Sequence, residues 1–108
     1  MPVLEAAACG LPVICTAGGA TDDVVTEESA LKIRSRLEIV SEREGGVVGK
    51  RVIPDLDHLV ELIRQAINDQ AWRQRAGAAG AGHVHSRFTW DLVTDRLVEA
   101  FRRMHERG

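Results

Sequence analysis

The apolar residues of the first half predict a helix followed by short buried strands. Val3 to Cys9 is a run of good helix formers that stops before Gly10, and glycine is common just after a helix. Val13 to Cys15 is continuously apolar, which is typical of strands in a parallel sheet with both faces covered. Ala30 to Ile33 predicts another strand. This half therefore predicts an α/β arrangement.

The middle of the chain is the least regular part. Leu37 to Val40 is a short apolar run of undetermined type. It lies in a polar stretch from Arg34 to Lys50, which we expect to form a loop or a hairpin region. Arg51 to Ile53 predicts a brief strand that ends at Pro54.

Three helices are predicted for the second half. The first begins after a cap at Asp55 or Asp57 and breaks at residues 68–69, with apolar residues at helical spacing: Leu59, Leu62, Ile63, Ala66 and Ile67. Gln70 to about Val84 predicts a second helix, which Gly77, Gly80 and Gly82 weaken. Thr89 caps a third helix with four apolar residues on its faces, Leu92, Leu97, Val98 and Phe101, and we expect its charged end, residues 102–108, to fray.

Composition narrows the class of protein. The chain has 108 residues, so it forms one small domain at most, and 44% of them are hydrophobic, which is enough for a core. The formal net charge of -2 does not favour a nucleic-acid binder. The only cysteines, Cys9 and Cys15, lie in apolar surroundings, and we interpret them as reduced core thiols of a cytoplasmic protein.

The element order also predicts where a ligand would bind. One clear strand and two weaker ones make a thin sheet, so the pattern indicates part of a doubly wound domain. In open α/β sheets, ligands bind outside the carboxyl ends of the strands. The loop from Thr16 to Gly19 and the start of the first helix are therefore candidate walls of one cleft.

The segment PVLEAAACGLPVICTAGGATDDV, residues 2–24, resembles the C-terminal domain of retaining glycosyltransferases with the GT-B fold, in particular those of group 1 or family 4. The family pattern reads roughly E-G-F-G-x-x-x-x-E-A-x-A-C-G-x-P-V-I-x-T-x-x-G-G. The matching residues are Leu4-Glu5-Ala6, Ala8-Cys9-Gly10, Pro12-Val13-Ile14, Thr16 and Gly18-Gly19. Arg87-Phe88-Thr89-Trp90 resembles the F-T/S-W signature of the closing helices, so the resemblance covers nearly the whole chain.

The resemblance implies a fold and a function. It implies that residues 1–108 form one partial, Rossmann-like domain, with a small parallel sheet and flanking helices, which binds the nucleotide-diphosphate sugar donor of a glycosyltransferase. Glu5 would accept hydrogen bonds from the ribose hydroxyls, since a carboxylate can take two vicinal donors. The other implied donor-site residues are Leu4, Ala6, Thr16, Gly18 and Gly19. No catalytic residue, metal ligand or cofactor other than the donor substrate is implied.

Two departures from the family pattern matter. The first glutamate of the motif and its G-F-G segment would precede Met1, and the region from Arg34 to Val52 is longer and more charged than usual. The N-terminal acceptor domain of such enzymes has no counterpart in the chain. We therefore expect a fragment truncated at its N-terminus, with little transferase activity of its own.

Plainer interpretations remain open for each feature. Glu5 could be a solvated helix glutamate, and Gly18 and Gly19 could serve a tight turn. Asp22 and Asp23 are expected to cap a short helix, residues 23–26, rather than to bind a metal. The alternative function is a non-catalytic α/β module that associates with a partner chain. The basic end, Arg102, Arg103 and Arg107, leaves peripheral contact with a membrane as a weaker option.

Overall fold

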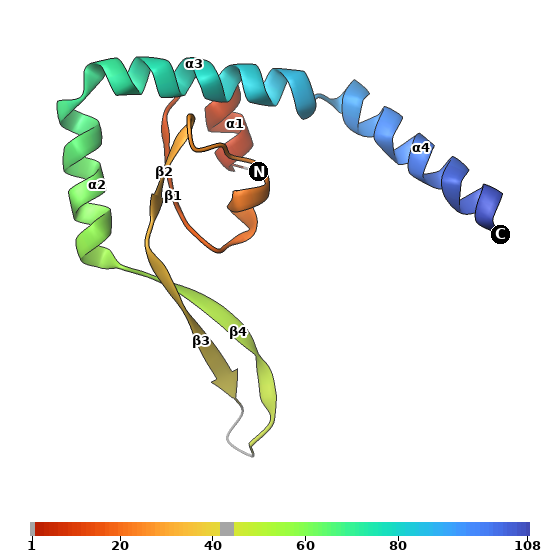
Figure 1. The fold of residues 1–108 in the computed structure, drawn as a ribbon, viewed down its shortest axis with the longest axis horizontal. Helices are drawn as coiled ribbons and strands as arrows, with labels where there is room; N and C mark the ends of the chain where they lie inside the picture. The colour runs from red at the N-terminus through yellow and green to blue at the C-terminus, as the bar shows by residue number, and fades with distance from the viewer. Residues whose placement is uncertain (1, 42–44) are drawn as a thin grey trace.

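Figure 1 shows the computed structural model of the chain, which describes residues 2–41 and 45–108. Its elements are α1 (Pro2–Ala8), β1 (Val13–Thr16), the 3₁₀ helix η1 (Ala20–Asp23), β2 (Ala30–Ile33), β3 (Ser35–Ser41), β4 (Val47–Pro54), α2 (Leu56–Asn68), α3 (Gln70–Arg87) and α4 (Trp90–Arg107). The predicted α/β class with a small parallel sheet is confirmed.

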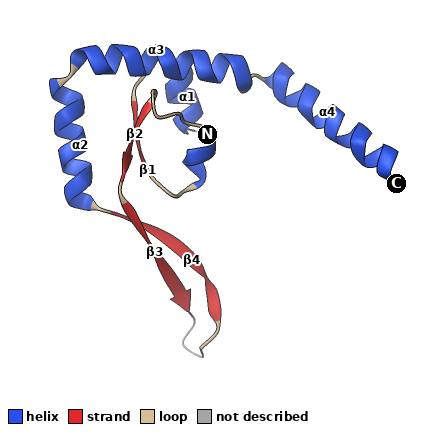
Figure 2. Ribbon diagram, in the orientation of Figure 1, coloured by secondary structure: helices blue, strands red, loops and turns tan. Residues whose placement is uncertain are grey.

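Two separate pairs of strands form the sheets (Figure 2). Strands β1 and β2 are parallel, with Val13 opposite Ala30 and Thr16 opposite Ile33. Strands β3 and β4 are antiparallel, and their register shifts between Val40 and Ser41. The β3–β4 hairpin extends away from the helices (Figure 1).

A small hydrophobic cluster holds the parallel sheet. Its buried members are Val13, Cys15, Val25 and Ala30, with Val3 and Val24 packed against them. The first turn of α1 and the segment after η1 therefore share one core with the two parallel strands. The cluster consists of small and medium side chains, as the low aromatic content, 4%, requires.

Glycines let α3 lie directly on the N-terminal part of the chain. A Cβ at Gly77 would overlap the carbonyl oxygen of Gly10. A Cβ at Gly80 would lie 3.5 Å from the Cβ of Ala7. Two of the three glycines that were expected to weaken this helix thus permit its close contact with α1 and the residue that follows it (Figure 1).

The three long helices begin at side-chain caps. Asp55 accepts a hydrogen bond from the backbone N–H of His58 at 3.1 Å, which settles the choice between Asp55 and Asp57. Asp69 caps α3 and Thr89 caps α4 in the same way. Helix α4 continues to Arg107, and the fraying of its charged end stays a prediction.

The structure corrects several predictions for the middle of the chain. The short helix occupies Ala20–Asp23 instead of residues 23–26. The polar stretch contains a hairpin, whose strands extend beyond the two apolar runs that were noted, Leu37 to Val40 and Arg51 to Ile53. Residues 42–44 of this stretch lie outside the described part of the chain. Cys15 is buried as expected, but Cys9 is exposed.

The molecule is open rather than compact. Its radius of gyration is 18.0 Å, against about 13 Å for a compact domain of this length. Helix α4 projects from the end of α3 and leaves Trp90 87% exposed and Phe101 60% exposed (Figure 1). These two aromatic side chains therefore lie outside the core of the described structure.

Candidate functional site

The carboxyl ends of β1 and β2 meet at one edge of the parallel sheet. Because the strands run in the same direction, Thr16 and Ile33 end side by side. The backbone N–H of Ala17 donates to the carbonyl of Ile33 at 3.0 Å, which extends the pairing by one residue. The loop Thr16–Gly19, here called the glycine loop, starts from this edge as the sequence predicts.

Asp22 fixes the conformation of the glycine loop. Gly18 has a φ of 83°, which favours glycine, and its N–H donates to Oδ2 of Asp22 at 2.8 Å. Nζ of Lys32, on β2, lies 3.1 Å from Oδ1 of the same carboxylate. The hydrogen bond from Gly18, and then the one from Lys32, hold the pKa of Asp22 below its ordinary value.

The capping role expected for Asp22 is therefore wrong. The residue that precedes η1 is Gly19, and no side chain caps this short helix. The Asp22 carboxylate reaches back four residues to the glycine loop, so it stabilises the candidate site and not the helix terminus.

Ser35 supports the same loop from the start of β3. Its hydroxyl donates to the carbonyl of Ala17 at 2.6 Å. A Cβ at Gly18 would lie 3.4 Å from Oγ of Ser35, so the hydroxyl also limits the space beside the loop. No local motif marks Ser35 or Lys32, because contacts between residues so far apart in the sequence follow from strand pairing.

The six predicted site residues are divided between α1 and the glycine loop. Glu5 is exposed, whereas Leu4 and Ala6 are half-buried. Thr16 and Gly19 are half-buried and Gly18 is exposed. Helix α1 is tied to the loop region through Val3, which packs on the same cluster as Val24. The structure thus groups three of the six predicted residues at one sheet edge and places the other three on the neighbouring helix.

A cavity of about 250 Å³ lies at the base of the hairpin, beside the glycine loop. Its lining residues are Arg34, Ser35, Arg36, Ile53, Pro54 and Asp55. None of the six predicted site residues lines it. Ser35 connects the two places, since it lines the cavity and bonds to Ala17.

Two kinds of feature are absent from the part of the chain that the structure describes. Within residues 2–41 and 45–108, no group of three or more histidine, cysteine or acidic side chains is placed to hold a metal ion. Among the helices that the structure describes, none is long and apolar enough to cross a membrane.

The chain is similar to three characterised enzymes. It is 33% identical over 95 residues to the GDP-mannose-dependent monoacylated alpha-(1-6)-phosphatidylinositol monomannoside mannosyltransferase of Corynebacterium glutamicum, a match that covers 88% of this chain and 20% of the relative. It is 28% identical over 102 residues to O-antigen chain mannosyltransferase B of Escherichia coli, covering 94% of the chain and 22% of the relative. It is 23% identical over 103 residues to sucrose synthase 1 of Hordeum vulgare, covering 91% of the chain and 10% of the relative.

These matches cover most of this chain but only a small part of each relative. The chain spans about a fifth of the length of the two mannosyltransferases and a tenth of the sucrose synthase. No family model matches the chain, and no solved structure matches it significantly. The similarity nevertheless runs through nearly the whole chain, and two of the three relatives are named as mannosyltransferases. The chain is therefore related to glycosyltransferases.

Proposed function

We propose that this chain is the donor-binding part of a retaining glycosyltransferase of the GT-B class, group 1 or family 4. In this proposal it binds a nucleotide-diphosphate sugar, and an acceptor domain elsewhere in the protein supplies the second substrate. The similarity to two mannosyltransferases over most of the chain carries the proposal. The glycine loop at the carboxyl edge of the parallel sheet supports it, because ligands of open α/β sheets bind there.

The proposal gives each part of the site a role. Glu5, exposed on α1, accepts hydrogen bonds from the ribose hydroxyls of the donor. The glycine loop borders the sugar and diphosphate, with Asp22 and Ser35 as the residues that hold it in position. The contribution to catalysis is positioning of the donor and stabilisation of the leaving diphosphate. The two free thiols suit a cytoplasmic location.

The donor is the first substrate to test. One relative is named for its dependence on GDP-mannose, so GDP-mannose is the probe that we choose, with a uridine diphosphate sugar as the comparison. We expect ligand-detected NMR and calorimetry to show binding of GDP-mannose to the chain. The loss of a charge-assisted hydrogen bond typically costs about 1.5–3 kcal/mol, so Glu5→Gln should weaken binding roughly tenfold or more.

A matched control separates this role from a general effect of charge. Glu27 is also exposed, and Glu27→Gln makes the same chemical change away from the glycine loop. We expect this control to bind like the unchanged chain. Equal binding by both variants would remove Glu5 from the donor site, and absence of nucleotide-sugar binding would overturn the donor-binding role. We expect no sugar transfer by the 108-residue chain alone, and full turnover would refute that part.

A specific observation favours a second candidate, a non-catalytic module that binds a partner chain. Helix α4 projects from the body, and the apolar residues along it are exposed, among them Trp90, Leu97, Phe101 and Met104. Such a surface is typical of an interface. Binding of GDP-mannose that depends on Glu5 would favour the first candidate, because an association module has no need of a ribose acceptor.

A further inference from the structure

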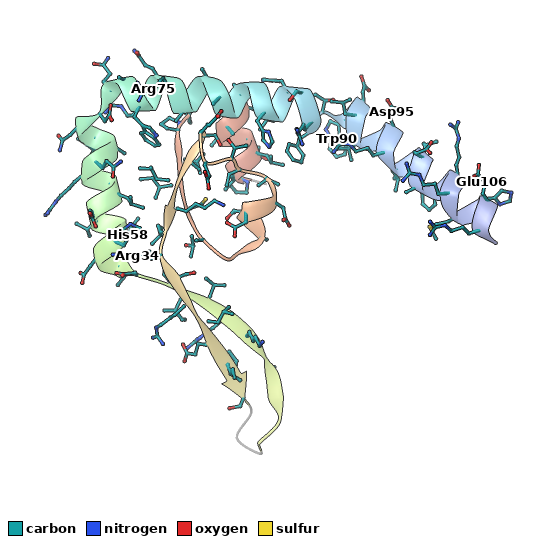
Figure 3. All side chains as sticks on the ribbon, viewed as in Figure 1. Arg34, His58, Arg75, Trp90, Asp95 and Glu106 are labelled. Carbon is teal, nitrogen blue, oxygen red and sulfur yellow. The ribbon has the colours of Figure 1, made fainter. Side chains whose placement is uncertain are left out.

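The junction between the hairpin and α2 depends on an unprotonated histidine. The backbone N–H of Arg34, which lies between β2 and β3, donates to Nδ1 of His58 at 2.8 Å. Figure 3 shows these two residues next to each other, at the base of the hairpin and the start of α2. A backbone N–H can only donate, so Nδ1 must carry no proton, and the neutral ring holds its proton on Nε2.

Three more contacts meet at the same junction. The N–H of Asp55 donates to the carbonyl of Arg34 at 2.8 Å. The N–H of His58 donates to Oδ1 of Asp55 at 3.1 Å. The guanidinium of Arg34 lies 3.9 Å from Oδ2 of Asp55. Arg34, Asp55 and His58 therefore connect the base of the hairpin to the first turn of α2.

We propose that this junction is a pH-sensitive latch, in which protonation of His58 releases Arg34 and loosens the hairpin from α2. An imidazolium carries a proton on both ring nitrogens, so it cannot accept the hydrogen bond from Arg34. Its Nδ1–H instead donates to the carboxylate of Asp55. Histidine is the side chain whose ordinary change of charge lies between about pH 5 and pH 8, which makes it the usual pH switch in proteins. The inference does not depend on the proposed function.

The charged groups around His58 can accommodate both the neutral and the protonated imidazole ring. The groups concerned are Arg34 from the junction, Asp55 before the helix, and Asp57 and Glu61 on α2 itself. Lys32, the charged residue of β2, is paired with Asp22. The carboxylate of Asp55 is thus the nearby acceptor for a protonated His58 ring. The backbone N–H of Arg34 is the donor that requires the neutral ring.

The latch also reaches the glycine loop. The residue after Arg34 is Ser35, whose hydroxyl holds the carbonyl of Ala17 at 2.6 Å. Movement of the hairpin base therefore changes the support of the loop. The cavity of about 250 Å³ lies at this point and is lined by residues from both sides of the junction, including Arg34 and Asp55.

Nuclear magnetic resonance on the full 108-residue chain tests the latch. Long-range proton–nitrogen correlations show which ring nitrogen of His58 carries the proton, and amide hydrogen exchange reports the Arg34 N–H. We expect the Nε2–H tautomer at about pH 7.5 and, at about pH 5.5, a fall of at least tenfold in the protection factor of Arg34, after correction for intrinsic rates. The amide of Ala17 should shift over the same pH range.

His58→Asn provides the decisive control. Its carboxamide oxygen can occupy the place of Nδ1 and accept from Arg34, but it does not titrate. We expect this variant to keep Arg34 protected at both pH values. His105→Asn, on the exposed end of α4, should behave like the unchanged chain. Constant protection of Arg34 in the unchanged chain, or the same loss in His58→Asn, would overturn the latch.

Discussion

At the scale of single residues, the chain uses charged side chains to hold backbone in place. Asp22 fixes Gly18, and Glu38 on β3 accepts two hydrogen bonds from Arg51 on β4, at 3.1 and 3.2 Å. Arg51 also holds the pKa of Glu38 below its ordinary value. The Glu38–Arg51 pair joins the two strands of the hairpin, which the apolar pattern alone does not bring together.

The titration of Asp22 should report its contacts. Its folded pKa lies below the ordinary value of 3.8, so the carboxylate stabilises the glycine loop fully above that value. The stabilisation is lost as the pH falls through the folded pKa. We expect carbon-detected NMR to find the Asp22 pKa below the ordinary value. Lys32→Met should raise it only in part, because the bond from Gly18 is the larger cause.

The opposite result for Asp22 would have a clear meaning. A pKa at or above the ordinary value would show that the carboxylate does not hold the loop. An unchanged pKa in Lys32→Met would remove the ion pair with Lys32 but leave the bond to Gly18 in place.

The sequence could predict single residues only where their role is local. Thr89 caps α4 through the residue three positions ahead, and Gly10 takes a φ of 78° just after α1, as expected. Asp22 does not cap η1, because its partners are the backbone N–H of Gly18 and the ammonium of Lys32. Ser35 and His58 have partners far along the chain, and no local motif marks them.

At the scale of elements, the sequence predicts the helices and the first strand. It predicts the hairpin only in part. Arg36 and Glu38 alternate with Leu37 and Ile39 along β3, which is the pattern of a strand. The four residues Leu37 to Val40 are too short a run to show this alternation, so their type cannot be predicted from apolar residues alone. Leu37 is 65% exposed in the hairpin, so the apolar residues of β3 do not indicate a buried strand.

The contact between α3 and α1 predicts opposite effects for two glycines of one helix. Gly77→Ala places a methyl group against the carbonyl of Gly10 and should destabilise the fold by about 1–3 kcal/mol. Gly82 has no atom near its would-be Cβ. Gly82→Ala should therefore stabilise α3 by about 0.5–1 kcal/mol, because alanine restricts the unfolded chain. Urea unfolding followed by circular dichroism measures both changes.

This pair of variants separates packing from helix propensity. If Gly77→Ala stabilised the chain as much as Gly82→Ala, the close approach of α3 and Gly10 would be wrong. Both glycines would then only lower the helix propensity of α3, as the sequence predicts, and neither would be needed for the contact with α1.

At the scale of the whole molecule, two apolar surfaces lack a partner among the described residues. One is the face of α4 that contains Leu97 and Phe101, and the other is on α2, where Val60 and Ile67 are exposed. The composition contains enough apolar residues for a core, but it does not predict how many of them the folded chain buries. The radius of gyration of 18.0 Å reflects this excess of uncovered surface.

The exposed face of α4 predicts self-association of the chain. Sedimentation equilibrium should show reversible association that increases with concentration, because burial of apolar surface yields about 25 cal/mol per Å². The double change Leu97→Gln with Phe101→Gln should shift the chain toward the monomer. The control is the double change Asp95→Asn with Glu106→Gln. These two positions lie about half a turn around the helix from Leu97 and Phe101, so this variant should leave association unchanged. A monomer at every concentration that unfolds cooperatively would mean that this face needs no partner, and would count against the association module.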